Sequence, residues 1–249
     1  MDATGDTGNA TAPEQAPAPE AEPATPAPHP ASDHPFGPDG AAILATEHWS
    51  LLASRSLIWN EAQSRATVFL SVLSAATIAL ALVADATGFG PQTTTLALVL
   101  LPVVLLLGIA AHGRLVEINR EELELSLAMN RLRHAYLEIA PALEPYFSTG
   151  HHDDEQGLAA SYLAGGHRLR RSGQFLVNIP TVVATVDAAL AAAIVVLLVR
   201  AVEAATAVAV VMGAVAFGIV WAVLFLLQRR ALDPLRRSTP RFPTPPDGA

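Results

Sequence analysis

Long apolar segments separated by polar ones dominate the pattern along the chain. Four stretches are nearly free of charged residues, at residues 66–84, 95–111, 177–199 and 204–227. A helix rises about 1.5 Å per residue and must cross about 30 Å of hydrocarbon, so roughly 18 or more consecutive apolar residues are typical of a membrane-spanning helix. The pattern therefore predicts an all-α membrane protein with four transmembrane helices arranged in two hairpins.

The third apolar stretch contains one acid, Asp187. On insertion scales a central Asp costs roughly 3 kcal/mol, while each Leu, Ile or Val contributes about −0.3 to −0.6 kcal/mol. Ten such residues lie between Val182 and Val199, so they offset the cost of the acid by a small margin. We therefore expect this segment to span the membrane, helped by a neighbouring helix.

The segments that flank the first two spans are amphipathic. Residues 41–65 contain no Gly or Pro and interrupt Leu with charged residues, which favours a helix. After the second span, apolar residues recur at alternating intervals of three and four, which is typical of a coiled-coil interface. This heptad seam, broken only by Glu122, consists of Leu115, Ile118, Leu125, Met129, Leu132, Tyr136 and Ile139. The seam predicts a long helix that extends from the second span and packs on either the 41–65 helix or a second copy of the chain.

These patterns divide the chain into six segments. We expect a disordered tail at 1–40, an amphipathic helix at 41–65, a transmembrane hairpin at 66–111, a helical segment at 112–176, a second hairpin at 177–228 and a basic disordered tail at 229–249. The first tail has nine Pro, seven acids and no base. Such a segment buries too little apolar surface to offset its ordering entropy.

Arginine placement predicts the orientation of the spans. All 15 basic residues are Arg, the loop at 84–94 has none, and the turn after the third span has only Arg200. Basic residues stay preferentially on the cytoplasmic side of a membrane. We therefore expect an inner-membrane protein with both termini and the 112–176 segment in the cytoplasm.

Two groups of Arg residues beside the spans are candidates for binding lipid headgroups. Arg168, Arg170 and Arg171 precede the third span, and Arg229 and Arg230 follow the fourth. A base near an anionic membrane surface contributes about 1 kcal/mol. The expected partner is the lipid bilayer, and nothing in the sequence indicates nucleic-acid binding.

One loop has the composition of a metal site. It contains His151, His152, Asp153, Asp154 and Glu155, and imidazole with carboxylate suits zinc, manganese or iron. A metal-dependent membrane enzyme is therefore one hypothesis. Loop polarity is the competing interpretation, because consecutive side chains do not readily face one ion and the sequence has no second motif such as HExxH. We predict no catalytic residue and no cofactor.

Asp187 is the strongest single functional candidate, because an ionisable group within a span generally marks a functional site. Asn178 is expected to cap the third spanning helix, with Pro180 in its first turn. Asp187 then lies two to three turns inside the helix. The competing interpretation is a structural polar clamp with hydroxyl groups of the first span, namely Ser71, Ser74 and Thr77.

Several stretches of the chain carry a resemblance to a known group of proteins. NRLRHAYLEIAP, LEPYF, HHDDEQG and NIPTVVATVDAAL resemble actinobacterial four-span integral membrane proteins to which no activity is assigned. The resemblance extends over about residues 44–228. It implies a membrane location and adds no activity.

Two hypotheses of function lead. The first is a non-enzymatic, homo-oligomeric membrane protein that self-associates or docks a cytoplasmic protein through the heptad seam. The second is a small oligomeric channel or transporter that uses Asp187.

Overall fold

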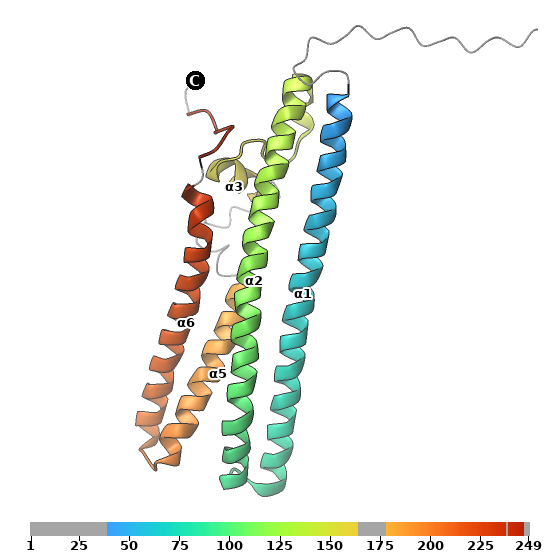
Figure 1. The fold of residues 1–249 in the computed structure, drawn as a ribbon. Helices are drawn as coiled ribbons and strands as arrows, with labels where there is room; N and C mark the ends of the chain where they lie inside the picture. The colour runs from blue at the N-terminus through green and yellow to red at the C-terminus, as the bar shows by residue number, and fades with distance from the viewer. Residues whose placement is uncertain (1–38, 164–177, 238, 247–249) are drawn as a thin grey trace, which may run out of the picture.

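The computed structural model describes residues 39–163, 178–237 and 239–246, and its long helices form an elongated bundle (Figure 1). The long helices are α1 (Gly40–Thr87), α2 (Pro91–Ile139), α5 (Ile179–Ala201) and α6 (Thr206–Arg237). Two short helices, η1 (Pro141–Tyr146) and α3 (Glu155–Leu163), follow α2. All four long helices are long and apolar enough to cross a membrane. The described residues contain no strand, so the prediction of an all-α chain with four apolar helices of spanning length is confirmed.

Two of these helices are much longer than a membrane is thick. α1 has 48 residues and α2 has 49, so each extends over roughly 70 Å. α1 includes both the 41–65 segment and the first apolar stretch without a break, and α2 continues through Pro102 to Ile139. The two helices run antiparallel and are joined by a short turn at residues 88–90 (Figure 1). Residues 40–65 of α1 and 112–139 of α2 are called the stalk below.

The two C-terminal long helices lie beside the apolar part of α2 that precedes the stalk. α5 and α6 are joined by a short connection, and that connection lies at the same end of the bundle as the α1–α2 turn (Figure 1). Asn178 caps α5 by accepting a 3.0 Å hydrogen bond from the Thr181 N–H, and Pro180 stands in the first turn. The predicted helix start is therefore confirmed.

The interior of the bundle is built from small and branched apolar side chains. Phe69 of α1, Val104 of α2 and Val183 of α5 are buried in one cluster. Large apolar side chains on the outer faces remain exposed, among them Leu106 and Ile219. This distribution suits helices surrounded by lipid, because lipid tails are as apolar as the exposed side chains.

In the stalk, α1 covers the centre of the heptad seam. Leu115, Ile118 and Met129 are buried, and the other apolar members of the seam are partly buried. The ring of His48 on α1 lies 5.9 Å from that of Tyr136 on α2, so the contact reaches the far part of the stalk. The centre of the seam is therefore closed within one chain.

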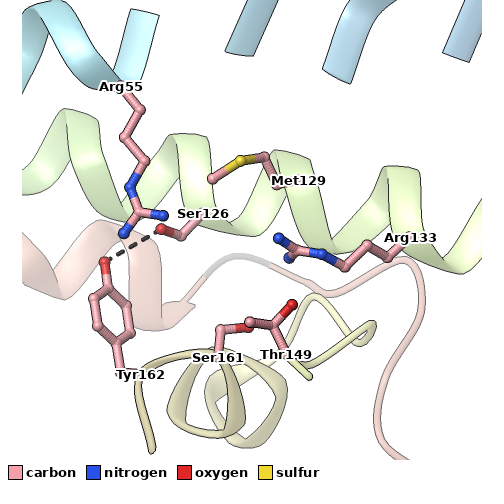
Figure 2. Close-up of a pocket in the computed structure, with 7 residues that line it drawn as sticks. All are labelled: Arg55, Ser126, Met129, Arg133, Thr149, Ser161 and Tyr162. Atoms are coloured by element: carbon pink, nitrogen blue, oxygen red, sulfur yellow. Dashed lines mark hydrogen bonds between the residues drawn. The ribbon is translucent and has the colours of Figure 1, made fainter. Parts of the chain in front are cut away.

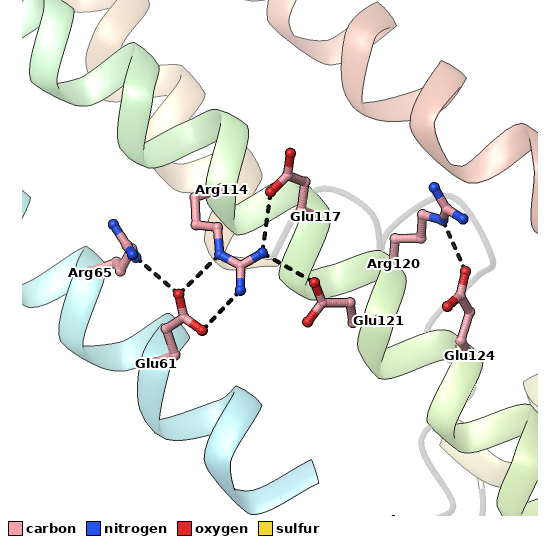
Figure 3. Close-up of polar contacts among 7 residues, drawn as sticks. All are labelled: Glu61, Arg65, Arg114, Glu117, Arg120, Glu121 and Glu124. Atoms are coloured by element: carbon pink, nitrogen blue, oxygen red, sulfur yellow. Dashed lines mark hydrogen bonds and ion pairs between the residues drawn. The ribbon is translucent and has the colours of Figure 1, made fainter. Parts of the chain in front are cut away.

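An ion-pair network fixes the register of α1 and α2 where the stalk meets the spans (Figure 3). Arg114 donates two hydrogen bonds to the carboxylate of Glu61, at 2.9 and 3.0 Å. The same guanidinium donates to Glu117 at 3.2 Å and to Glu121 at 3.1 Å. Because these groups are partly or largely solvated, we attribute to them alignment of the two helices more than stabilisation.

Candidate functional site

Asp187 occupies the interior of the helix bundle. It lies nine residues after the N-cap of α5, or about 13 Å along the helix axis. The residue has no exposed surface, and neither carboxylate oxygen has a hydrogen-bond partner. Buried polar groups in proteins are normally paired, because desolvation without a compensating hydrogen bond is costly. Asp187 is therefore a clear exception that calls for an explanation.

A glycine on α2 makes room for this carboxylate. A Cβ atom at Gly108 would lie 1.8 Å from Oδ1 of Asp187 and 2.8 Å from Cε2 of Phe69. These distances are far below a van der Waals contact, so any side chain at position 108 requires a displacement of its neighbours. The carboxylate is thus held directly against the α2 backbone, with the ring of Phe69 from α1 beside it.

The predicted polar clamp between Asp187 and the first span is wrong. Ser74 Oγ donates to the Leu70 carbonyl and Thr77 Oγ1 donates to the Leu73 carbonyl, each at 2.8 Å, while Ser71 is exposed. Helical hydroxyl groups commonly bond the carbonyl one turn back in this way. The first span therefore presents an aromatic ring, and no hydroxyl group, to the acid.

His112 is a buried residue of this region that sequence reasoning missed. It follows the second apolar stretch directly and lies one turn after Gly108, about 6 Å closer to the stalk. Its Nδ1 donates to the Pro180 carbonyl at 3.0 Å. Its Nε2 has no partner with hydrogen-bond geometry, although the Leu224 backbone of α6 lies near it. The signal that could have found it is its place on the same inward face as Val104 and Gly108.

A layer of polar side chains joins α5 and α6 close to His112. Thr181 Oγ1 donates to Asn178 Oδ1 at 2.7 Å, and Gln228 Nε2 donates to the same oxygen at 3.3 Å. Thr181 and Gln228 are both buried. With His112 they form what we call the polar layer, which separates the Asp187 region from the stalk.

The predicted metal residues lie elsewhere, in the loop before α3, and the carboxylate of Asp153 binds backbone groups. It is buried and accepts hydrogen bonds from Arg131 Nε at 2.7 Å, from the Phe242 N–H at 2.7 Å and from the Arg241 N–H at 3.0 Å. Burial would raise the pKa of Asp153, but these hydrogen bonds outweigh burial and hold it below its ordinary 3.8.

Asp154 binds the same C-terminal segment two residues further along, at Thr244. Its carboxylate accepts hydrogen bonds from the Thr244 N–H at 2.7 Å, from the Thr244 hydroxyl at 2.9 Å and from the Gly157 N–H at 2.7 Å. Burial opposes ionisation here too, yet the bonds keep the pKa of Asp154 below its ordinary value. Residues 241–244, called the C-terminal strap, are thus fastened to the loop before α3.

The strap differs from the disordered basic tail expected at 229–249. The chain is helical as far as Arg237, and residues 241–244 are bound by two ionised carboxylates. The ring of Phe242 also stacks on that of His134, with centroids 4.2 Å apart. Hydrogen bonds and ring packing between distant segments explain why the local composition was misleading.

The imidazoles of this loop do not complete a metal site in the described part of the chain. His151 and His152 lie with ring centroids 4.2 Å apart. Among the described residues, no group of three or more potential His, Cys, Asp or Glu ligands converges. The carboxylates of Asp153 and Asp154 in this loop are already bound to the strap. The arrangement therefore favours the structural interpretation of this loop.

Two of the five candidate lipid-binding arginines lie within the described residues. Arg229 and Arg230 are exposed near the end of α6, and the Arg229 guanidinium lies 5.8 Å from the ring centroid of Phe225. Arg168, Arg170 and Arg171 lie outside the described residues, as does the acidic tail as far as residue 38.

Comparisons with known proteins assign no family to this chain. No protein-family model, no curated protein and no solved structure matches it. Function is therefore inferred from the geometry alone.

Proposed function

We propose that the protein is a small oligomeric channel or transporter that moves protons, with Asp187 as the group that takes up and releases the proton. The observation that carries this proposal is the completely buried carboxylate with two unpaired oxygens. Ionisable side chains inside spanning helices are costly, and they generally line ion or proton pathways.

The surroundings of Asp187 favour a proton over a larger ion. The backbone at Gly108 and the ring of Phe69 lie beside the carboxylate, and neither supplies the several oxygen ligands that a metal cation requires. A proton needs only a chain of groups within hydrogen-bonding reach of each other. Protonation also removes the unfavourable buried charge, so loading of the acid is stabilising in itself.

The polar layer supplies one side of the proposed pathway. His112 lies one turn from Gly108 and has one ring nitrogen without a partner of hydrogen-bond geometry. An imidazole in such a position can accept a proton on one side and release it on the other. The stalk side of the bundle carries most of the arginines, and we therefore assign it to the cytoplasm.

Proton flux into proteoliposomes tests the proposal. Wild-type protein, Asp187→Asn and the matched control Asp85→Asn are reconstituted with an internal pH-sensitive dye, and a potassium diffusion potential drives uptake. Asp85 is an exposed acid near the C-terminal end of α1. We expect flux with wild type and Asp85→Asn, and loss of flux with Asp187→Asn. Wild-type flux equal to that of empty liposomes, or unchanged flux in Asp187→Asn, would refute the assignment.

A second candidate is the non-enzymatic interaction protein, which self-associates or docks a cytoplasmic partner. The observation that favours it is the exposure of Trp49 (72%) and Trp59 (57%) on α1 of the stalk, since large exposed aromatic residues often mark binding surfaces. Cross-linking in native membranes compares wild type with Trp49→Ala and with Leu125→Asp/Leu132→Asp in the seam. Products that are the same in all three proteins would exclude both the exposed face and the seam.

A further inference from the structure

A small cavity lies in the stalk, at a distance from the Asp187 region (Figure 2). Its volume is about 30 Å³, and it is lined by Arg55, Ser126, Met129, Arg133, Thr149, Ser161 and Tyr162. One water needs roughly 10–15 Å³ by this measure, so the cavity holds about two oxygen atoms of a small ligand. It is partly open, so the remainder of such a ligand can face solvent.

Two guanidinium groups enter this cavity from different helices. Arg55 comes from α1 and Arg133 from α2, and their planar groups point towards the same space (Figure 2). Arg55 is neutralised by Glu122, with Nη2 and Nε at 2.7 and 3.1 Å from one carboxylate oxygen. The charge of Arg133 is not balanced in the same way.

Arg133 is a half-buried cation without an acidic partner among the residues that the structure describes. One of its N–H groups donates to Asn130 Oδ1 at 2.8 Å, whereas a guanidinium has five N–H donors in a planar fork. Burial, and then the nearby charge of Arg55, lower the pKa of Arg133. Both effects are relieved by an anion, because opposite charge stabilises the protonated group.

Hydroxyl groups complete the lining. Ser126 Oγ and Tyr162 OH lie 3.2 Å apart, and the tyrosine hydroxyl also donates to Glu122. Burial, and then the charge of Glu122, raise the pKa of Tyr162, so the phenol keeps the proton that it donates to Glu122. Thr149 lines the wall from the loop before α3. The forked N–H donors of Arg133, with the Thr149 side chain also in the lining, match the geometry of a phosphate oxyanion.

We propose that this cavity binds the phosphate group of a water-soluble ligand, either inorganic phosphate or a soluble phosphomonoester. A phospholipid headgroup has the same chemistry, but its position differs. Arg55 lies ten residues before Arg65, so the cavity stands about 15 Å above the start of the first span. Soluble phosphate reaches that height, whereas a headgroup remains at the membrane surface. The cavity shares no residue with the Asp187 region, so this proposal does not rest on proton movement.

Equilibrium dialysis with radiolabelled inorganic phosphate tests the proposal on the full-length protein in phospholipid-free detergent at constant ionic strength. The variants are Arg133→Gln, Arg133→Lys and the control Arg120→Gln, whose exposed guanidinium pairs with Glu124 on the same helix. We expect saturable binding to wild type and to the control, roughly tenfold weaker binding to Arg133→Lys because the fork is lost, and none to Arg133→Gln. Circular dichroism verifies that each variant is folded.

A second arm distinguishes the two sources of phosphate. Vesicles that contain phosphatidic acid are offered to wild-type protein in competition with labelled phosphate, against vesicles of phosphatidylcholine alone. Phenyl phosphate, a soluble phosphomonoester, is offered as a second competitor. Displacement of the label by phenyl phosphate, without displacement by phosphatidic acid, supports the soluble ligand. The proposal is overturned if wild type shows no saturable binding, if Arg133→Gln binds as wild type does, or if phosphatidic acid alone displaces the label. Should Arg133→Gln fail to fold, undiminished binding by folded Arg133→Lys overturns it equally.

Discussion

At the scale of single residues, the close contact between Asp187 and Gly108 combines two features that lower the stability of the folded protein. Glycine within a helix costs about 1 kcal/mol relative to alanine, and an unpaired buried carboxyl adds a further cost. Both costs fall at one point on the α2–α5 interface. Residues that lower stability in this way are often retained for a function that requires them.

We expect Gly108→Ala to lower the stability of the protein by about 1–3 kcal/mol, because the new methyl group overlaps Asp187 and Phe69. The control is Gly218→Ala, since a Cβ at Gly218 meets no atom within 4 Å. That change should be neutral or stabilise α6 by up to about 1 kcal/mol through helix propensity. Thermal unfolding in one detergent compares the two. A melting temperature for Gly108→Ala at or above that of Gly218→Ala would contradict the close contact.

At the scale of elements, the strap is held by ionised carboxylates, so its docking depends on pH. The pKa values of Asp153 and Asp154 are lowered below 3.8 in the folded protein. Their contribution is therefore complete above the unfolded pKa and is lost as pH falls through the lowered folded pKa. We expect the strap to stay docked through the neutral range and to detach only in strong acid.

A nitroxide label on Pro246→Cys measures this docking, because the chain has no other cysteine. The label should be immobilised at neutral pH and become mobile in strong acid. Asp154→Asn should release it at neutral pH, since two bonds from Thr244 and one from Gly157 lose their ionised acceptor. Glu124→Gln serves as the control, because Glu124 is an exposed acid on α2, outside the loop that binds the strap. An equally immobile label in Asp154→Asn would show that these bonds do not hold the strap.

The stalk gives a second prediction at this scale. Met129→Ala should destabilise the protein by about 2–5 kcal/mol, because the side chain is 1% exposed at the centre of the seam. Leu57→Ala, at a side chain 70% exposed on α1, should have little effect. Chemical denaturation followed by circular dichroism compares them. Equal losses in the two variants would mean that Met129 is not buried at the centre of the seam as described.

The heptad spacing illustrates what sequence could predict about the elements. It predicted the long helix, and Leu115, Ile118 and Met129 of its apolar face are indeed buried. It left open which segment covers that face, because a repeat of three and four describes one helix surface and is silent about the partner. The strap could not be predicted at all. The bonds between Asp153 and Phe242 join residues 89 positions apart and depend on tertiary structure.

At the scale of the whole molecule, composition predicted the four apolar helices. A helix that crosses lipid needs a long uninterrupted run of apolar residues, and such a run is visible in the sequence. The candidate site was predicted only in part. Asp187 was evident as an acid within a span, whereas His112 and Gln228 became part of the same region only when three helices were placed together. Each lies at the polar end of an apolar stretch, and only the three-dimensional structure shows that it is buried.

The orientation of the molecule can be tested with single cysteines. We expect Glu203→Cys, in the turn between α5 and α6, to react with a membrane-impermeant maleimide in intact cells. Ser148→Cys, beyond η1 at the stalk end, should react only after the cells are permeabilised. The expectation follows from the arginine distribution. The reverse labelling pattern would place the stalk outside and remove the cytoplasmic proton supply proposed through His112.

The unbroken course of α2 has a mechanical consequence. From Gly108 to Ile139 the helix has no interruption and measures roughly 46 Å. A rod of that length pivoting by about 5° moves its tip by roughly 4 Å, so an adjustment of tenths of an ångström beside the buried acid is magnified many times at the far end. The α2 residues that line the cavity, Ser126, Met129 and Arg133, lie along the outer half of this rod and move with it.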